Sequence, residues 1–387
     1  MRVRLLATWC VVVGLLGVAG GGCGPSTSGG GGRPFTGGGP TGAPNSAGGA
    51  QRDPLGYSFG LAQVSSVSGG TVTALAAVPG TTADSLAAHA PLQQVNRLVQ
   101  GQPGALETTF AGSAVDLVEL GNAVFAATGN RALNGVGDVF RRVEPTPGAP
   151  TWSPVLDTND REATVAALTS GNQLVAATGG EGGAGTLWTL DGTSLAIVSS
   201  LSLGAQVPTA SLEFPAGSGD VYVGTTSNAT GGSAAGLLRV SGGAIQSLNL
   251  PSAGAQAGVR EQVTALVRTP SATGVDQLAV AVARVSLASG APLGGAVYVT
   301  DGASFTLVAT LATNDAPTAL ASTDNTLYVG TALGQLLYLD GGAIQTEPGL
   351  PALTRIDSLL VRDAKTLVIG GQNTAGAVAV TRTGNTP

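Results

Sequence analysis

The sequence predicts an all-β protein, a seven-bladed β-propeller of four-stranded antiparallel blades whose ring is closed by an N-terminal strand that completes the last blade. Three observations support this prediction. Short apolar runs separated by tight-turn residues recur along most of the chain. They recur with a period of about 47 residues, the length of a propeller blade. The last unit is one strand short, and an unassigned strand-like run precedes the first unit.

The repeating unit is clearest at residues 326–344, T-L-Y-V-G-T-A-L-G-Q-L-L-Y-L-D-G-G-A-I. An alternating apolar run ends in Gly-Thr, the chain turns through Gly334, and a second apolar run leads to Asp340-Gly341-Gly342. Asp-Gly and Gly-Gly tolerate the positive φ angles that tight hairpins need. The unit is therefore predicted to alternate strands and tight turns.

Segments similar to V-T-A-L open seven such units, at roughly 39- to 54-residue intervals. They begin at Val72, Val115, Val165, Thr209, Val263, Pro317 and Ile356. A single blade cannot bury both of its faces, so neighbouring units must stack, and closing the ring removes the exposed ends. A β-helix is excluded because its coils are about half as long or shorter.

The two ends of the repeat region predict how the ring closes. The last unit stops after its third strand, near Thr381. The run from Tyr57 to Val67 is strand-like and belongs to no unit. We expect it to supply the missing outer strand of the last blade, so that residues 55–387 form one propeller domain.

The N-terminus is predicted to be a secretory signal over residues 1–22. Met1-Arg2-Val3-Arg4 is positive, and the apolar run from Leu5 to Ala19 is shorter than the roughly twenty residues that span a bilayer. Gly20-Gly21-Gly22-Cys23 resembles the bacterial lipoprotein signal, although that family usually has Leu where this chain has Gly20. The resemblance implies that Cys23 is lipidated and becomes the mature N-terminus. Ordinary secretion with Cys23 as a passive residue is the alternative.

Residues 23–54 are predicted to form a flexible tether between this anchor and the propeller. They are mostly Gly, Pro, Ser, Thr and Ala, a composition that buries too little apolar surface to offset the entropy of ordering. An anchor followed by a spacer predicts an exported protein of the bacterial cell envelope, held by its N-terminal lipid on the periplasmic side or at the cell surface.

Two short motifs resemble known propellers. L-Y-V-G-T followed by G-Q-L-L-Y-L-D-G-G is similar to the repeats of bacterial propellers of the YVTN and two-component-regulator sensor type. Thr300-Asp301-Gly302-Ala303-Ser304-Phe305 resembles the Asp-box turn of sialidase-like propellers, one residue shorter and with Phe in place of Trp. The first resemblance implies a seven-bladed propeller. Because the second motif is incomplete, no sialidase activity is inferred from it.

The composition argues against several classes of function. A net charge of −6 does not suit nucleic acid, and no polybasic patch is present to hold an anionic membrane. No nucleophile elbow occurs, and no D-x-D-x-D run suggests calcium. The single histidine, His89, is interpreted as a structural or exposed residue. We therefore expect no catalytic residue, no metal and no cofactor.

Charged residues gather at two kinds of position. Asp116 and Asp357 are assigned to the second position of the opening strand, which lines the central channel; the alternative is that they cap strands or pair with Arg. A second set lies in loops that enter the opening strands, and these loops are expected to surround the channel mouth. This set comprises Asp160, Arg161, Glu162, Arg260, Glu261, Asp315 and Arg355. Arginine binds carboxylate or phosphate through two parallel hydrogen bonds, so we interpret this face as a binding surface.

The sequence thus favours a monomeric, non-enzymatic binding or scaffolding propeller that engages a protein or polymer at the cell envelope. The alternative is an exported glycan hydrolase or lyase, with Asp116 and Asp357 as its carboxylates. Such an enzyme needs the two groups roughly 5 to 9 Å apart. A quinone-dependent dehydrogenase is a third class, but the aromatic stacking residues that it needs are missing.

Overall fold

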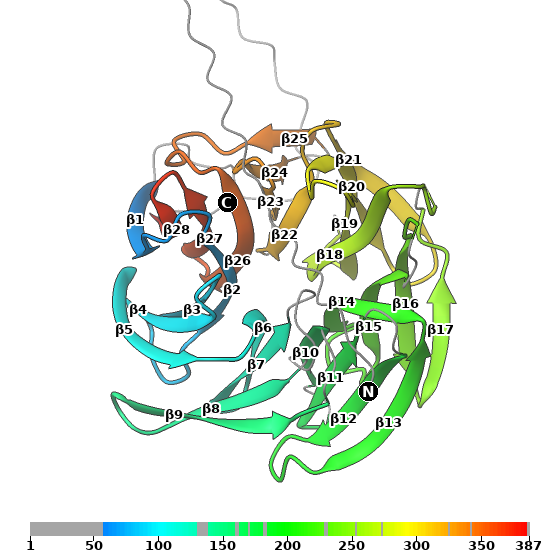
Figure 1. Cartoon of the computed structure of the whole chain (residues 1–387), viewed down its shortest axis with the longest axis horizontal. Helices are drawn as coiled ribbons and strands as arrows, with labels where there is room; N and C mark the ends of the chain where they lie inside the picture. Colours follow the sequence, from blue (N-terminus) through cyan, green and yellow to red (C-terminus); the bar gives the residue numbers. More distant parts are fainter. Residues whose placement is uncertain are drawn as a thin grey trace, which may run out of the picture. The chain divides into compact units, whose positions relative to one another are not determined.

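The structure is a computed structural model. It describes residues 57–129, 138–158, 162–168, 171–180, 184–227, 231–251, 254–271, 274–323, 326–340 and 343–384. Within these residues the strands form seven separate four-stranded antiparallel sheets, which confirms the predicted seven-bladed propeller (Figure 1). No helix in this part of the chain is long and apolar enough to cross a membrane.

Each sheet is one blade, and the strands of each blade follow in order from the innermost to the outermost. The first blade comprises β2 (Thr71–Ala77), β3 (Ser85–Ala90), β4 (Gln94–Val99) and β5 (Gln102–Thr109). The second comprises β6 (Ser113–Leu120), β7 (Ala123–Gly129), β8 (Val139–Thr146) and β9 (Ala149–Leu156), and the third comprises β10 (Glu162–Leu168), β11 (Gln173–Gly179), β12 (Gly185–Asp191) and β13 (Ile197–Gly204). The fourth comprises β14 (Gln206–Glu213), β15 (Val221–Ser227), β16 (Ala235–Ser241) and β17 (Ala244–Leu248). The fifth blade comprises β18 (Val259–Pro270), β19 (Asp276–Ser286), β20 (Pro292–Thr300) and β21 (Phe305–Leu311). The sixth comprises β22 (Pro317–Ser322), β23 (Leu327–Thr331), β24 (Leu336–Asp340) and β25 (Ala343–Thr346). The seventh comprises β26 (Arg355–Asp363), β27 (Thr366–Asn373), β28 (Gly376–Gly384) and β1 (Tyr57–Ser65).

The innermost strands contact one another in sequence around the ring, and β26 of the last blade lies beside β2 of the first. The seventh blade is completed by β1, which pairs antiparallel with β28 from Tyr57↔Gly384 to Ser65↔Ala377. The predicted closing strand is therefore confirmed. Figure 1 shows this blade combining the blue start and the red end of the described chain.

A buried ion pair lies beneath the closing strand. The Nε of Arg382 on β28 lies 3.2 Å from Oε1 of Glu347, which follows β25, and both side chains are completely buried. The ring of Tyr57 on β1 covers the Arg382 guanidinium, with 3.9 Å between the ring centroid and Cζ. Burying a charge is costly unless a partner compensates it, so Glu347 and the ring of Tyr57 stabilise Arg382 in its buried position.

The glycine of the V-G-T motif has a packing role. A Cβ added at Gly330 would lie 2.5 Å from Cγ2 of Ile356, on the first strand of the next blade. A Cβ added at Gly370 would lie 2.6 Å from Cγ1 of Val72 in the same way. The second strands are almost wholly buried because the neighbouring blade packs on them, and at these two positions glycine leaves room for the β-branched side chain that faces it.

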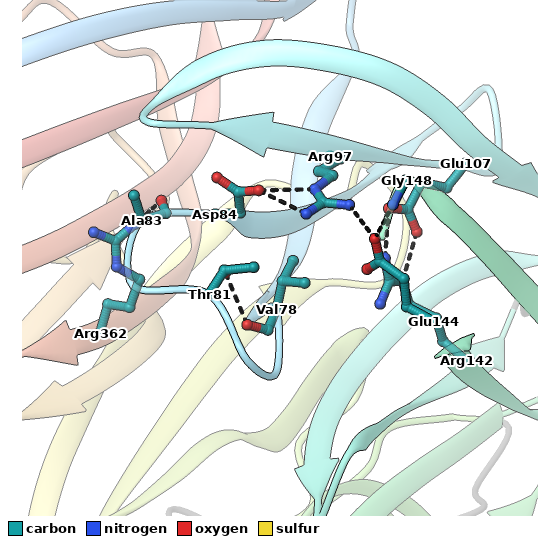
Figure 2. Close-up of polar contacts among 10 residues, drawn as sticks. All are labelled: Val78, Thr81, Ala83, Asp84, Arg97, Glu107, Arg142, Glu144, Gly148 and Arg362. Atoms are coloured by element: carbon teal, nitrogen blue, oxygen red, sulfur yellow. Dashed lines mark hydrogen bonds and ion pairs between the residues drawn. The ribbon is translucent and has the colours of Figure 1, made fainter. Parts of the chain in front are cut away.

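Charged side chains also join the outer parts of the first two blades (Figure 2). Arg97 on β4 pairs with Asp84 at 2.7 Å and reaches across to Glu144 on β8 at 2.8 Å. Arg142 on β8 pairs with Glu107 on β5 at 2.7 Å and with Glu144 at 2.8 Å. Arg142 and Glu107 are almost completely buried, at 2% and 3% exposure. These five groups form a structural contact between blades, away from the central channel.

Candidate functional site

A cavity of about 580 Å³ lies at one mouth of the central channel. All seven blades border it, mostly through the starts of their first strands. We call it the mouth cavity. Its polar lining comprises Arg260, Arg355, Asp357, Gln262, Gln372, Thr71, Thr73, Thr164, Thr209, Thr264 and Thr318. A second cavity of about 210 Å³, the lower cavity, lies further along the same strands and is bordered by Asp116 and Asp357.

A β-bulge in the first strand aims one side chain of most blades into the mouth cavity. In six blades the pairing of the first with the second strand skips one residue, which therefore has no cross-strand partner. The skipped residues are Thr73, Val115, Thr209, Thr264, Thr318 and Asp357, and all six line the mouth cavity. The first strand of the third blade, β10, pairs with β11 without a bulge.

Three of the bulged threonines tie their blade to the next one. The hydroxyl of Thr73 donates to the carbonyl oxygen of Ala114 at 2.6 Å, and that of Thr264 donates to Pro317 at 2.9 Å. Thr318 donates to the carbonyl oxygen of Ile356 in the same way. The proton of each of these hydroxyls is therefore used within the fold.

The register corrects the assignment of Asp116 and Asp357 to equivalent positions. The bulge of β6 falls on Val115, whereas the bulge of β26 falls on Asp357. Asp116 is therefore equivalent to Ser358, one residue beyond the bulge. The assignment was wrong because the letters V-D-L-V align with I-D-S-L, while the extra bulged residue lies one place earlier in the second blade.

Asp116 makes an interblade hydrogen bond. Its Oδ2 accepts the N–H of Val165 on β10, at 3.0 Å. Burial raises the pKa of Asp116 to about 6, although the N–H groups of Val165 and Leu117 act to lower it. The structure thus supports the structural interpretation of this carboxylate.

Asp357 faces the mouth cavity but is held by two neighbours. The hydroxyl of Thr71 donates to its Oδ2 at 2.6 Å, and the Nε of Arg355 lies 2.6 Å from its Oδ1. Within the described residues, Arg355 is held only through Nε, and its side chain is 46% exposed. The two terminal amino groups of Arg355 are therefore left for solvent or a ligand.

Two threonines on the opposite side of the mouth cavity retain unused hydroxyls. The Oγ1 atoms of Thr164 and Thr209 are buried and have no hydrogen-bond partner in the described part of the chain. Thr164 is only 3% exposed. Each hydroxyl can donate one hydrogen bond and accept two. A buried polar group without a partner is unfavourable, so a ligand that satisfied both would gain affinity.

The predicted loop-face residues divide into two groups. Arg260 and Arg355 line the mouth cavity. Glu261 is 3% exposed, and its Oε2 lies 3.4 Å from the N–H of Ala235. Asp315 is 5% exposed, and its Oδ1 accepts the N–H groups of Ala316 and Leu333 at 2.8 and 3.0 Å. Glu261 and Asp315 therefore have structural roles.

The remaining predicted site residues cannot be placed beside these. Cys23, Asp160 and Arg161 lie outside the described residues. Glu162 begins β10, but its side chain is not among those described.

His89, the single histidine, is buried in β3 at 1% exposure. Burial lowers the pKa of the imidazole, although the nearby side chain of Gln94 acts to raise it; neither ring nitrogen meets the geometry of a hydrogen bond with a described residue. In the described residues no group of three or more histidine, cysteine, aspartate or glutamate side chains is placed to hold a metal ion.

The Asp-box-like turn stabilises a hairpin. The Oδ1 of Asp301 accepts the N–H groups of Ala303 and Ser304 at 2.9 and 3.2 Å, between β20 and the outer strand β21. Tyr298 and Phe305 pack edge to face beside it, with ring centroids 6.5 Å apart.

Comparison with known proteins adds no family. A scan against protein-family models finds no match for this chain, and a search of curated proteins finds none either.

Proposed function

We propose that this protein is an exported, lipid-anchored propeller that binds a partner protein or polymer of the cell envelope at its channel mouth, as a monomer and without catalysing a reaction. We also propose that it is a bacterial lipoprotein of the YVTN or two-component-regulator sensor type of propeller. The N-terminal signal, Cys23 and the tether support export and anchoring. The repeat motif L-Y-V-G-T supports the type of propeller.

The observation that supports binding most strongly is the presence of Arg260 and Arg355 in one cavity. They come from the fifth and seventh blades and face the same space of about 580 Å³. That volume lies in the range of small-ligand pockets, roughly 300 to 1,000 Å³. In a chain of net charge −6, two guanidinium groups at the channel mouth form a local site for an anionic group.

The alternative, a glycan hydrolase or lyase, depends on Asp116 and Asp357. Both carboxylates border the lower cavity, which favours it. However, Asp116 accepts the N–H of Val165, and Asp357 is held by Arg355 and Thr71. Each carboxylate thus has a structural partner already, so we favour the binding function.

Crosslinking and affinity capture from the native envelope test the proposal. The wild-type chain is expected to capture a partner, and the double variant Arg260→Ala, Arg355→Ala is expected to lose it. Lys365→Ala is the matched control, because Lys365 lies in the β26–β27 turn, at the opposite end of β26 from Arg355. Full capture by the double variant would contradict binding at the channel mouth.

A further inference from the structure

We infer that the mouth cavity receives the free carboxyl terminus of an extended polypeptide. This inference depends on the proposed binding function and specifies the chemistry of its partner. Three features of the cavity support it: a basic pair, a set of hydrogen-bonding groups that the described residues leave unsatisfied, and a rim of exposed leucines on the same face of the propeller.

The basic pair suits a terminal carboxylate. Asp357 binds Arg355 through Nε, so the guanidinium is held in place while its terminal amino groups remain for a ligand. A planar guanidinium binds carboxylate with strong, charge-assisted hydrogen bonds. Arg260 faces the same cavity from the fifth blade. Because Asp357 neutralises part of the charge of Arg355, the cavity suits a single carboxylate better than a highly charged anion.

The polar lining suits a peptide backbone behind that carboxylate. An extended chain presents N–H donors and C=O acceptors that need partners once they leave water. The buried hydroxyls of Thr164 and Thr209 find no partner among the described residues, and the amide-bearing residues Gln262 and Gln372 line the same cavity. Hydroxyl and amide groups both donate and accept, so they match a backbone. At about 580 Å³, the cavity has room for more than the carboxylate itself.

The rim supplies apolar contacts for the preceding side chains. Leu92, Leu287 and Leu333 are 38%, 38% and 45% exposed, in the turns between the second and third strands of the first, fifth and sixth blades. Two of these turns also line the mouth cavity, through Gly290 and Ala332. These leucines lie on the face of the propeller at which the mouth cavity opens, where they can contact the apolar side chains that precede a bound carboxyl terminus.

The rim and the lining together favour a polypeptide over a sugar polymer. Sugar rings usually stack on aromatic side chains, and the described lining of the mouth cavity contains none. The partner is therefore expected to be a protein whose C-terminal residues are apolar and accessible.

A library of random peptides displayed with free C-termini tests the inference. It is selected on the full-length purified chain and counter-selected on the double variant Arg260→Ala, Arg355→Ala. Binding of an enriched peptide is then measured by fluorescence polarisation, as the free acid and as the C-terminal amide. We expect amidation to weaken binding about tenfold or more, since it removes a charge-assisted hydrogen-bond pair. We expect Thr209→Val to weaken it as well.

Two results would overturn the inference: no peptide enriched on the wild-type chain, or an amide that binds as tightly as the acid. Lys365→Ala should bind the acid-form peptide as the wild type does, and melting curves of the double arginine variant test whether it is folded.

Envelope capture separates this inference from the proposed function. If capture needs Arg260 and Arg355 but no peptide binds, the function stands and the carboxyl-terminus inference fails. If capture is unchanged in the double variant, both fail.

Discussion

The hydroxyl of Ser358 donates a 3.0 Å hydrogen bond to the carbonyl oxygen of Val72, which lies 286 residues earlier in the chain. This bond joins the seventh blade to the first at the wall of the channel. At the outer edge the same two ends meet again, because β1 pairs with β28. The ring is thus closed at its inner and outer radius by segments far apart in sequence, and this closure positions Arg355 and Asp357 at the mouth cavity.

Deleting residues 55–67 should destabilise the whole domain. The deletion removes β1, uncovers the buried pair Arg382–Glu347 and leaves β28 as an unpaired edge. We expect a loss of several kcal/mol in unfolding free energy, seen as a lower midpoint in thermal or denaturant melts. The control is a chain that lacks residues 1–54 and begins at Leu55. It keeps β1 and should melt like the wild type. An unchanged midpoint in the longer deletion would contradict the role given to β1.

Replacing Gly330 by alanine should destabilise the fold, because the new Cβ would meet Ile356 at 2.5 Å. Overpacking of this kind costs about 1 to 3 kcal/mol. Gly231→Ala is the matched control, since a Cβ there would have no atom within 4 Å. Denaturant unfolding of both variants gives the difference. Equal stability of the two would show that the blades shift apart more easily than their packing suggests.

The charged contact between the first two blades predicts a stability loss in acid. Burial alone would raise the pKa of Glu144, but the N–H of Gly148 and the guanidinium groups of Arg97 and Arg142 outweigh it and lower the pKa to about 2. The folded state then binds this proton less tightly than the unfolded state. The stabilisation is therefore present above the ordinary value of 4.5 and is lost as the pH falls towards 2.

Unfolding measured between pH 6 and pH 2 tests this, with Glu144→Gln as the comparison. The variant should be less stable than the wild type at pH 6 and should approach it at the acid end. A difference that does not change with pH would contradict the assignment.

The buried pair in the same contact predicts a second effect on stability. Arg142→Ala leaves Glu107 buried without its partner and should lower the unfolding free energy, measured by denaturant unfolding, by about 3 to 5 kcal/mol.

Asp116 should show the opposite dependence on pH. Its pKa is raised from 3.8 to about 6, so the folded state binds the proton more tightly than the unfolded state. This contribution to stability is complete below pH 3.8 and is lost as the pH rises through 6. Asp116→Asn, whose amide oxygen can still accept the N–H of Val165, should match the wild type near pH 4 and exceed its stability at pH 8. A variant that is less stable at pH 8 would show that the ionised carboxylate is needed.

The fold was predictable because each local signal agreed with the global arrangement. The repeated V-G-T motif and the Asp-Gly turns define strands and hairpins, and the missing outer strand of the last unit predicts β1. The pairing register of the first and second strands could not be predicted in the same way. A bulge moves by one residue without any change in composition, so the alignment of sequence letters puts Asp116 at the wrong position.

The candidate site was predicted only in part. Arg260 and Arg355 were found because charge is rare in this chain, but Glu261 and Asp315 have the same type of position and are buried. Thr164 and Thr209 were missed as site residues. Thr209 occupies the same bulged position as Thr264, whose hydroxyl is bonded, and only the contacts between blades separate these two cases. Thr164 lies in β10, which has no bulge, so the repeat pattern gives no signal for it.

Lipid anchoring predicts a clear effect of Cys23→Ser. The variant should be exported but released into the soluble envelope fraction, because it lacks the acceptor thiol. Fractionation with metabolic fatty-acid labelling measures both effects, and an alanine substitution at a tether serine is the control. A wild-type chain that is itself unlabelled and soluble would favour ordinary secretion with a passive Cys23.

The most direct test of binding at the channel mouth places a photo-crosslinking amino acid at position 115, where Val115 is exposed and lines the mouth cavity, in the chain expressed in its native envelope. The same amino acid at position 365, at the opposite end of the seventh blade's first strand, is the comparison. We expect one discrete protein adduct from position 115 and none from position 365. An adduct formed only from position 365, or no adduct from position 115, would contradict a binding site at the channel mouth.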